Sequence, residues 1–327
     1  MANISIRDAL NQALDEELAR DDKVFLMGEE VAQYNGAYKV SQGLWDKYGD
    51  KRIIDTPITE LSFAGVGIGA AMLGLRPVVE MMTWNFAILA MDQIINTAAK
   101  MRLMSGGEYR VPITFRGPNG AAHMLSAQHS QATENWYCNV PGLKVVAPCN
   151  PNDAKGLLKA SIRDDDPVIF LESEIMYNVT GPCSEAEDHV IPLGKCDVKR
   201  EGTDVTVIGF SKSVPHALGA AEVLAKDGVS VEVIDLMTLR PLDMATIRAS
   251  VKKTNRVVTV EEGWPYGGIG AELACRIQRE SFDDLDAPVI RVTGLDVPMP
   301  YAENLEELVV PNVSDVVGAI NTVMYRS

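Results

Sequence analysis

Short apolar runs alternate with longer stretches of helical periodicity along the first half of this 327-residue chain. The apolar runs predict strands at residues 24–27, 78–82, 113–116, 144–147 and 168–172. The longer stretches predict helices at residues 6–19, 61–73, 87–104 and 153–163. Ser5 and Asp8, three residues apart, form an N-cap pattern for the first helix. Continuous apolar strands separated by helices indicate a mostly parallel sheet covered on both faces.

The alternation breaks between about residues 173 and 202, where glycine, proline and acidic residues replace the periodic pattern. It then resumes. Strands are predicted at residues 204–208, 231–235, 256–261 and 289–292, and helices at 214–226, 270–280 and 313–325. The predicted fold class is therefore α/β: two successive three-layer domains with mostly parallel sheets. We expect these domains at residues 1–180 and 200–327, joined by a linker at 181–199.

Composition narrows the class of protein. With 30 basic and 45 acidic residues the formal charge is −15, which argues against nucleic acid or anionic lipid as a partner. No apolar run approaches the roughly 18 residues that span a bilayer. The first residues resemble neither a signal nor a transit peptide, so we expect a cytoplasmic protein or a processed organellar one. Five dispersed cysteines indicate free thiols in a reducing compartment.

A glycine pattern at residues 65–70 matches the loose dinucleotide motif G-x-G-x-x-[GA]. In that motif the glycines form a tight turn between a strand and a helix. Here they are embedded in a stretch that is helical from its start, and the next strand comes too early for the acidic residue of the motif. We therefore interpret the small residues mainly as permitting close packing of this helix against another helix or subunit.

Glu60 follows Pro57 and falls in the first turn of the predicted glycine-containing helix. An acidic residue at this position often only complements the positive helix terminus. The following residues are almost wholly apolar, however, so we expect both faces of the helix to be buried. A carboxylate at the end of such a helix should be partly desolvated and suited to sharing a proton.

Two polar or aromatic segments follow predicted strands, where ligands gather in parallel α/β sheets. Residues 82–86 include Met82 and Phe86, which either floor a flat ligand or pack in the core. The loop at residues 117–131 is rich in polar residues, and its His129 is either a proton donor or a structural histidine. The chain has no phosphate-binding P-loop, no G-x-S-x-G elbow, no H-E-x-x-H, and no G-D-G motif with a downstream Asn.

Taken together, ordered segments across nearly the whole chain resemble the β subunit of thiamine-diphosphate-dependent 2-oxoacid dehydrogenases, within the transketolase-like superfamily. The matching segments are Gly28-Glu-Glu-Val-Ala-Gln33, Arg52-Ile-Ile-Asp-Thr-Pro-Ile-Thr-Glu60, Arg116-Gly-Pro-Asn-Gly120, Gln128-His-Ser-Gln131, Pro141-Gly-Leu-Lys-Val-Val146, Leu239-Arg-Pro-Leu-Asp243, Glu262-Gly-Trp-Pro265 and Asp296-Val-Pro-Met-Pro-Tyr301. The resemblance implies a transketolase-like pyrimidine-binding domain followed by a transketolase C-terminal-like domain.

The resemblance also implies roles for single residues. Glu60 matches the glutamate that hydrogen-bonds the pyrimidine nitrogen of thiamine diphosphate, and Phe86 matches the aromatic residue that packs on that ring, with Met82 nearby. His129 matches the histidine that assists reductive acylation of the lipoyl group. A structural potassium site, made largely of backbone carbonyls, maps to positions at two segments of the first domain. These positions are Ile113, Ser161, Ile162, Asp164 and Asp166.

The implied assembly is an α2β2 heterotetramer in which the α subunit holds Mg²⁺ and the diphosphate, which would explain the missing G-D-G motif. The second domain would help to assemble the tetramer and would dock the dihydrolipoyl acyltransferase core. Residues 117–120 and 172–177 resemble pyruvate-type more than branched-chain-type subunits, which implies conversion of pyruvate towards acetyl-CoA. Branched-chain oxoacid and acetoin dehydrogenases are the alternatives, and a catalytically dead α/β scaffold is the non-enzyme alternative.

Overall fold

Parallel strands form the centre of the first of two units in the computed structural model, which describes residues 1–326. This unit comprises residues 1–119 and 136–193. Its strands run in the order β6-β7-β5-β4-β2-β3, all parallel. Their bounds are β2 Val24–Gly28, β3 Ile53–Asp55, β4 Arg76–Glu80, β5 Thr114–Pro118, β6 Lys144–Val146 and β7 Val168–Glu172. All predicted strands of this half are confirmed, and the three-residue β3 was missed.

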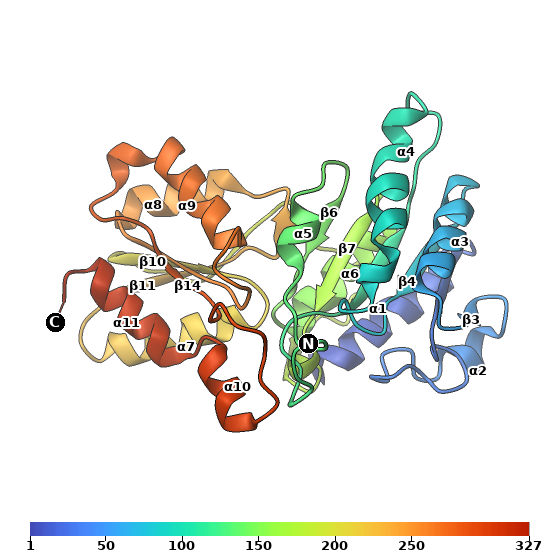
Figure 1. Cartoon of the computed structure of the whole chain (residues 1–327), viewed down its shortest axis with the longest axis horizontal. Coiled ribbons are helices and arrows are strands. Elements are labelled where there is room, and N and C mark those ends of the chain that lie inside the picture. The colour runs from blue at the N-terminus through green and yellow to red at the C-terminus, as the bar shows by residue number, and fades with distance from the viewer. Residues whose placement is uncertain (327) are drawn as a thin grey trace. The chain divides into compact units, whose positions relative to one another are not determined.

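Helices cover both faces of this sheet (Figure 1). They are α1 Ile6–Arg20, α2 Leu44–Tyr48, α3 Glu60–Met72, α4 Ala99–Met104, α5 Glu134–Cys138 and α6 Pro151–Arg163. Helices α1 and α6 pack side by side. The N-cap predicted for α1 is confirmed, because the Ser5 hydroxyl accepts the Asp8 N–H at 3.1 Å. The helix predicted at residues 87–104 is irregular: a 3₁₀ turn at Ala87–Ala90 and a π-helical turn at Gln93–Ala98 precede α4.

Short elements complete the first unit. Strand β1 (Ala2–Ser5) pairs antiparallel with β8 (Thr180–Cys183), which ties the start of the chain to the end of the predicted first domain. A 3₁₀ turn, Glu174–Met176, follows β7. The core consists of side chains from both faces of the strands, among them Leu26, Val79 and Phe115, which are almost fully buried.

The second unit comprises residues 120–135 together with the chain from residue 194 onward. Its strand order is β14-β13-β10-β11-β9, parallel except for β9, which is antiparallel to β11. The strands are β9 Asp197–Arg200, β10 Val205–Gly209, β11 Val231–Asp235, β13 Val257–Val260 and β14 Ile290–Val292; β12 (Thr238–Arg240) also belongs to this part of the chain. The mostly parallel α/β prediction is confirmed here too.

Helices again lie on both faces of the second sheet (Figure 1). Helices α7 and α11 pack together on one face, and α8 and α9 lie on the other. Their bounds are α7 Ser213–Ala225, α8 Met244–Thr254, α9 Ile269–Glu280, α10 Glu303–Val309 and α11 Val313–Val323, with a 3₁₀ turn at Phe282–Asp284. The helices α8 and α10 were not predicted. Within residues 1–326, no helix has both the length and the hydropathy needed to cross a membrane.

Candidate active site

Four neighbouring parallel strands, β5, β4, β2 and β3, deliver the predicted site residues of the first unit. Gly28 at the end of β2 lies level with Glu80 on β4 and with Asp55 on β3. The segments that leave these strands therefore start from the same edge of the sheet, where ligands bind in parallel α/β folds. One of them carries Glu60 and another carries Met82 and Phe86.

Glu60 is the first residue of α3 and is only 5% exposed. The N-cap residue, Thr59, makes no side-chain capping hydrogen bond, so Glu60 supplies the negative charge at the positive end of this helix. The prediction that Glu60 would lie in the first helical turn and be at least partly desolvated is confirmed.

The glycines of α3 lie within the helix and form no strand-to-helix turn, so the dinucleotide interpretation is wrong. The predicted packing against a helix is seen at Gly65, where an added Cβ atom would lie 3.3 Å from Gln93 Oε1 of the π-helical turn, whereas Gly67 packs against the sheet. A Cβ atom on Gly67 would lie 2.8 Å from Val79 Cγ2 on β4, which shows how closely the helix approaches the sheet. The prediction that both faces of α3 are buried is wrong for this chain, since Leu61 is 48% and Val66 is 63% exposed. Apolarity alone did not reveal which face the sheet covers.

Sequence reasoning missed Glu29, the residue that follows β2. It is only 4% exposed, and its Oε1 has no hydrogen-bond partner among the described residues. Burial, together with the smaller effect of the negative charge of Glu60, raises the pKa of Glu29 to about 7. The two carboxyl groups are therefore electrostatically coupled. The signal available in the sequence was an acidic residue immediately after a wholly apolar strand.

Met82 and Phe86 lie in the segment that follows β4, and both are partly exposed. The Trp84 N–H donates to the carbonyl of Pro118 at the end of β5 at 2.9 Å, and within the segment the Phe86 N–H donates to the Thr83 carbonyl at 3.0 Å. Trp84 is fully buried and meets the Tyr137 ring edge-on, with centroids 4.8 Å apart. Met82 and Phe86, two residues before and after Trp84, remain partly exposed, whereas Thr83 and Asn85 are buried.

A buried charge cluster ties the ends of β4, β5 and β7 together. The Arg116 guanidinium pairs with Glu80 and with Glu172, and the Tyr177 hydroxyl donates to Glu172 Oε2 at 2.6 Å. All four side chains are buried. Burial raises the pKa of Glu80, and the positive charge of Arg116 opposes that rise. These buried ion pairs link the carboxyl-terminal ends of β4, β5 and β7, next to the segment that contains Met82 and Phe86.

We expect Arg116→Met to destabilise the first unit by about 3–5 kcal/mol, because two buried carboxylates would lose their cation. The measurement is the midpoint of thermal unfolding of the full chain. Arg102→Met is the matched control: Arg102 pairs with Asp166, its side chain is 52% exposed, and its loss should cost no more than about 1 kcal/mol. Equal midpoints for the two variants would contradict a structural role of the cluster.

His129 lies in the segment 120–135, which belongs by its contacts to the second unit. The base of its loop is closed by the Gly120 N–H, which donates to the Gln131 carbonyl at 3.0 Å. The His129 N–H donates to the Ser126 carbonyl at 3.3 Å, and the side chain is partly exposed. The prediction placed His129 within the first domain at residues 1–180, and nothing in the local pattern indicates its attachment to the second unit.

Of the predicted potassium positions, Ile113 lies just before β5, Ser161 and Ile162 lie in the last turn of α6, and Asp164 and Asp166 lie between α6 and β7. Arg76 Nη1 donates to the carbonyls of Ile162 (3.2 Å) and Asp164 (2.9 Å), so these two oxygens converge on one point. The carbonyls of Ile113 and Ser161 accept backbone N–H groups from Val168 and Asp164. The Asp166 side chain pairs with Arg102 and Lys144. Of the five positions expected to bind potassium, only the carbonyl oxygens of Ile162 and Asp164 are thus shown to converge, and they converge on the Arg76 guanidinium.

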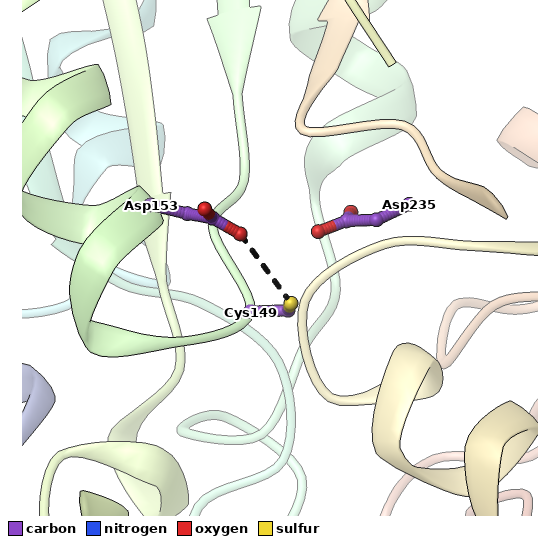
Figure 2. A group of neighbouring side chains, drawn as sticks. All are labelled: Cys149, Asp153 and Asp235. Carbon is purple, nitrogen blue, oxygen red and sulfur yellow. Dashed lines mark hydrogen bonds between the residues drawn. The ribbon is translucent and has the colours of Figure 1, made fainter. Parts of the chain in front are cut away.

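The cysteines are free thiols in the described residues, as predicted. Cys149 is buried just before α6, and its thiol lies 3.8 Å from Asp153 Oδ2 (Figure 2). Asn150 caps the same helix, accepting the Asp153 N–H at 2.9 Å and donating to the Asp153 carboxylate at 2.5 Å. The side chains of Cys149, Asn150 and Asp153 therefore form the N-terminal cap of α6 and its hydrogen-bonded surroundings.

The sequence matches two family models, one for each half of the chain. Residues 2–180 match the pyrimidine-binding domain of transketolase, and residues 194–316 match the transketolase C-terminal domain. A solved split-gene transketolase, an inactive β4 tetramer, has the same fold, with a TM-score of 0.81, 23% identity and 99% of both chains covered. The chain is thus built from the two transketolase-type domains.

More similar relatives narrow the class. The human mitochondrial pyruvate dehydrogenase E1 component subunit β is 59% identical over 321 residues, covering 97% of this chain and 89% of the relative. The corresponding subunits of Dictyostelium discoideum and Arabidopsis thaliana (β-1) are each 57% identical over 327 residues, covering 99% of this chain and 92% and 90% of the relatives. The chain belongs to the family of pyruvate dehydrogenase E1 component β subunits.

Proposed function

We propose that this chain is the β subunit of a thiamine-diphosphate-dependent pyruvate dehydrogenase, which decarboxylates pyruvate oxidatively and acetylates lipoyl groups on the path to acetyl-CoA. The observation that carries the proposal is the buried Glu60 at the start of α3, on the ligand-binding edge of a pyrimidine-binding domain. Membership of the pyruvate dehydrogenase family supports the choice of substrate.

Bound thiamine diphosphate would supply an electron sink for the carbon that loses carbon dioxide. Glu60 would hold a proton at the pyrimidine ring nitrogen. Because this carboxyl group is largely desolvated, its hydrogen bond to a ring nitrogen would be stronger than in water. Phe86 would pack on the pyrimidine ring, with Met82 nearby; both side chains are partly exposed and so accessible to a ligand. No motif for Mg²⁺ and diphosphate occurs in the chain, so we assign that task to an α subunit.

Glu29 would share in the proton chemistry of Glu60. With a pKa of about 7, Glu29 is protonated in about half of the molecules at neutral pH, so it can both accept and release a proton there. This arrangement is suited to returning a proton to Glu60.

The pKa of Glu29 predicts a pH-dependent stability. The pKa of this acid rises on folding from 4.5 to about 7, so the folded state binds its proton more tightly than the unfolded state. The free energy of unfolding should therefore fall as the pH rises from about 5 to 8. Glu29→Gln removes this effect. We therefore expect the variant of the full chain to gain up to about 3 kcal/mol relative to the parent at pH 8, but much less at pH 5. Thermal unfolding at a series of pH values measures this. A stability difference between Glu29→Gln and the parent that does not change with pH would contradict the raised pKa of Glu29.

A partner would cover the exposed side of α3 and its neighbours. Ile58, Leu61, Val66, Leu73 and Leu89 are all large apolar residues that are 48% to 86% exposed on or near α3. Exposed apolar residues in such a group mark an interaction surface. We propose that an α subunit binds here, adjacent to Glu60, and so completes the active site. This proposal would also give the apolar outer face of α3 the burial that its sequence predicted.

The proposed assembly is the one that the family resemblance implies. We propose an α2β2 heterotetramer whose second domain helps assembly and docks a dihydrolipoyl acyltransferase core. The relatives are named as mitochondrial proteins, so the compartment would be the mitochondrial matrix, or the cytoplasm in a bacterium. The net charge of −15 suits a basic docking partner.

We also propose that K⁺ binds among the carbonyls of Ile113, Ser161, Ile162 and Asp164, with Asp166 beside them. A carbonyl has two lone pairs, so those of Ile162 and Asp164 could each serve Arg76 and a cation. We expect a higher midpoint of thermal unfolding in potassium chloride than in choline chloride at equal ionic strength. Equal midpoints would remove the potassium site and leave Arg76 as the group that satisfies these carbonyls.

The test of the overall function is reconstitution. The full chain should be inactive alone and should gain pyruvate decarboxylation when mixed with a cognate α subunit, thiamine diphosphate and Mg²⁺. A panel of pyruvate, branched-chain 2-oxoacids and acetoin then separates the substrate classes. Preference for a branched-chain oxoacid or acetoin would overturn the substrate, and inactivity with every substrate in a correctly assembled complex would support a scaffold role.

A further inference from the structure

The loop that carries His129 is fastened to the second unit at several points of its backbone. The Glu262 carboxylate accepts the Ala121 N–H, and Glu306 Oε2 accepts the Met124 N–H at 3.0 Å. These bonds add to the Gly120–Gln131 bond that closes the base of the loop. The two acidic anchors come from different elements, since Glu262 follows β13 and Glu306 lies on α10.

Steric fit at Gly120 gives independent support for the Glu262 anchor. Gly120 has a φ of +84°, and a Cβ atom on it would lie 2.5 Å from Glu262 Oε2. The carboxylate thus rests directly against the backbone of the loop, where only glycine fits. The next residue, Ala121, is 2% exposed and packs with Met299 and Val309. Hydrogen bonding and packing hold the same short stretch of backbone.

A buried lysine holds Glu262 in place. Lys212 Nζ lies 2.7 Å from Glu262 Oε1, and the two side chains are only 7% and 13% exposed. Lys212 immediately precedes α7, so the carboxylate is fixed to a regular helix of the second unit. Because the ion pair is largely desolvated, Glu262 has a defined position from which to bind the loop.

Backbone strain shows that the loop conformation depends on such anchors. Met124 and Ser126 have φ values of +56° and +65°, in the left-handed region that non-glycine residues rarely adopt. Strained conformations of this kind persist only where the surroundings hold them in place. The anchored residues Ala121 and Met124 lie in the same stretch, before His129.

We propose that Glu262, held by Lys212, is a positioning residue for the loop of His129, and that the second domain thereby takes part in reductive acetylation as well as in assembly. This inference rests on the proposed function, because it takes from it the role of His129. Glu262 would act only through the loop. Its side chain would set the backbone at Gly120 and Ala121 and, with Glu306, the approach of His129 to a lipoyl group.

Glu262→Ala, Glu262→Gln and the exposed control Glu307→Gln test this in the assembled α2β2 enzyme. In Glu262→Ala, amide hydrogen exchange in residues 120–124 should accelerate about 10-fold or more, because a hydrogen bond to a charged acceptor is lost. The kcat for acetylation of a lipoyl domain should fall by a similar factor, with little change in KM for pyruvate. Glu262→Gln should recover much of both losses, since its carbonyl can still accept the Ala121 N–H. Glu307→Gln should behave like the parent.

Unchanged exchange and unchanged acetylation in a folded, assembled Glu262→Ala variant would overturn the proposal. If Glu262→Ala unfolds the enzyme, the double variant Lys212→Met/Glu262→Gln replaces it, because it keeps a hydrogen-bond acceptor without leaving an unpaired buried charge. The inference then requires that residues 120–124 of the double variant remain protected from amide hydrogen exchange. Failure of the proposed function would give a different result: exchange would accelerate in Glu262→Ala, but His129→Ala would acetylate lipoyl domains normally. That result would support the role of Glu262 as an anchor of the loop and would remove the role of His129.

Discussion

Glu60→Gln is expected to lower turnover of the assembled enzyme by about 10²- to 10⁴-fold, the range for loss of a positioned acid–base group. Glutamine preserves the size of the side chain and can still occupy the first turn of α3, so the fold and the assembly should remain intact. It cannot share a proton with a ring nitrogen. Because Glu60 is 5% exposed, bulk water cannot readily replace it in that task.

The measurement is steady-state oxidation of pyruvate by enzyme reconstituted with saturating thiamine diphosphate. Glu108→Gln is a suitable control, since Glu108 is an exposed acid in the same unit. It should retain parental activity. Turnover within a few-fold of the parent in a correctly assembled Glu60→Gln enzyme would show that this carboxyl group is not part of the catalytic machinery.

The second large effect is expected at His129. His129→Ala should lower reductive acetylation of a lipoyl domain by about 10²-fold, as expected for loss of a proton donor. Decarboxylation measured with an artificial electron acceptor should fall much less, because Glu60 and Glu29 would still be present. Comparing the two half-reactions in the same preparation separates a role towards the lipoyl group from general damage to the site.

His123→Ala is the matched control for this prediction. His123 lies in the same loop and is exposed, so its removal should leave both half-reactions unchanged. Equal losses of both half-reactions in His129→Ala would contradict the specific role. Equal behaviour of the two histidine variants would show that neither ring contributes.

The alternating pattern predicted the architecture well because strands in a mostly parallel sheet are apolar on both faces. Strands such as β2 and β7 are buried at every position, so they stand out from their surroundings. Short elements such as β3, with three residues, are too brief to carry a period. The mixture of 3₁₀ and π turns at Ala87–Ala98 escaped prediction because its side chains still follow a roughly helical pattern.

Within the site, local pattern reached Glu60 but not its neighbour Glu29. Glu60 begins an apolar helix, and that contrast is visible over a few residues. The coupling of Glu29 to Glu60 depends on two parallel strands placing distant segments together, which local periodicity does not encode. The attachment of residues 120–135 to the second unit is a contact of the same long-range kind. The exposed face of α3 shows a further limit, since the apolar pattern does not tell which face the chain itself covers and which face would be covered by the proposed α subunit.

Exchange of the C2 proton of bound thiamine diphosphate for deuterium tests the central claim most directly. It reports proton transfer at the cofactor before substrate binds, independently of substrate choice or the lipoyl group. In the assembled enzyme, Glu60→Gln should bind the cofactor and slow this exchange by on the order of 10²-fold or more. Parental exchange in a variant that binds the cofactor fully would contradict the role given to Glu60.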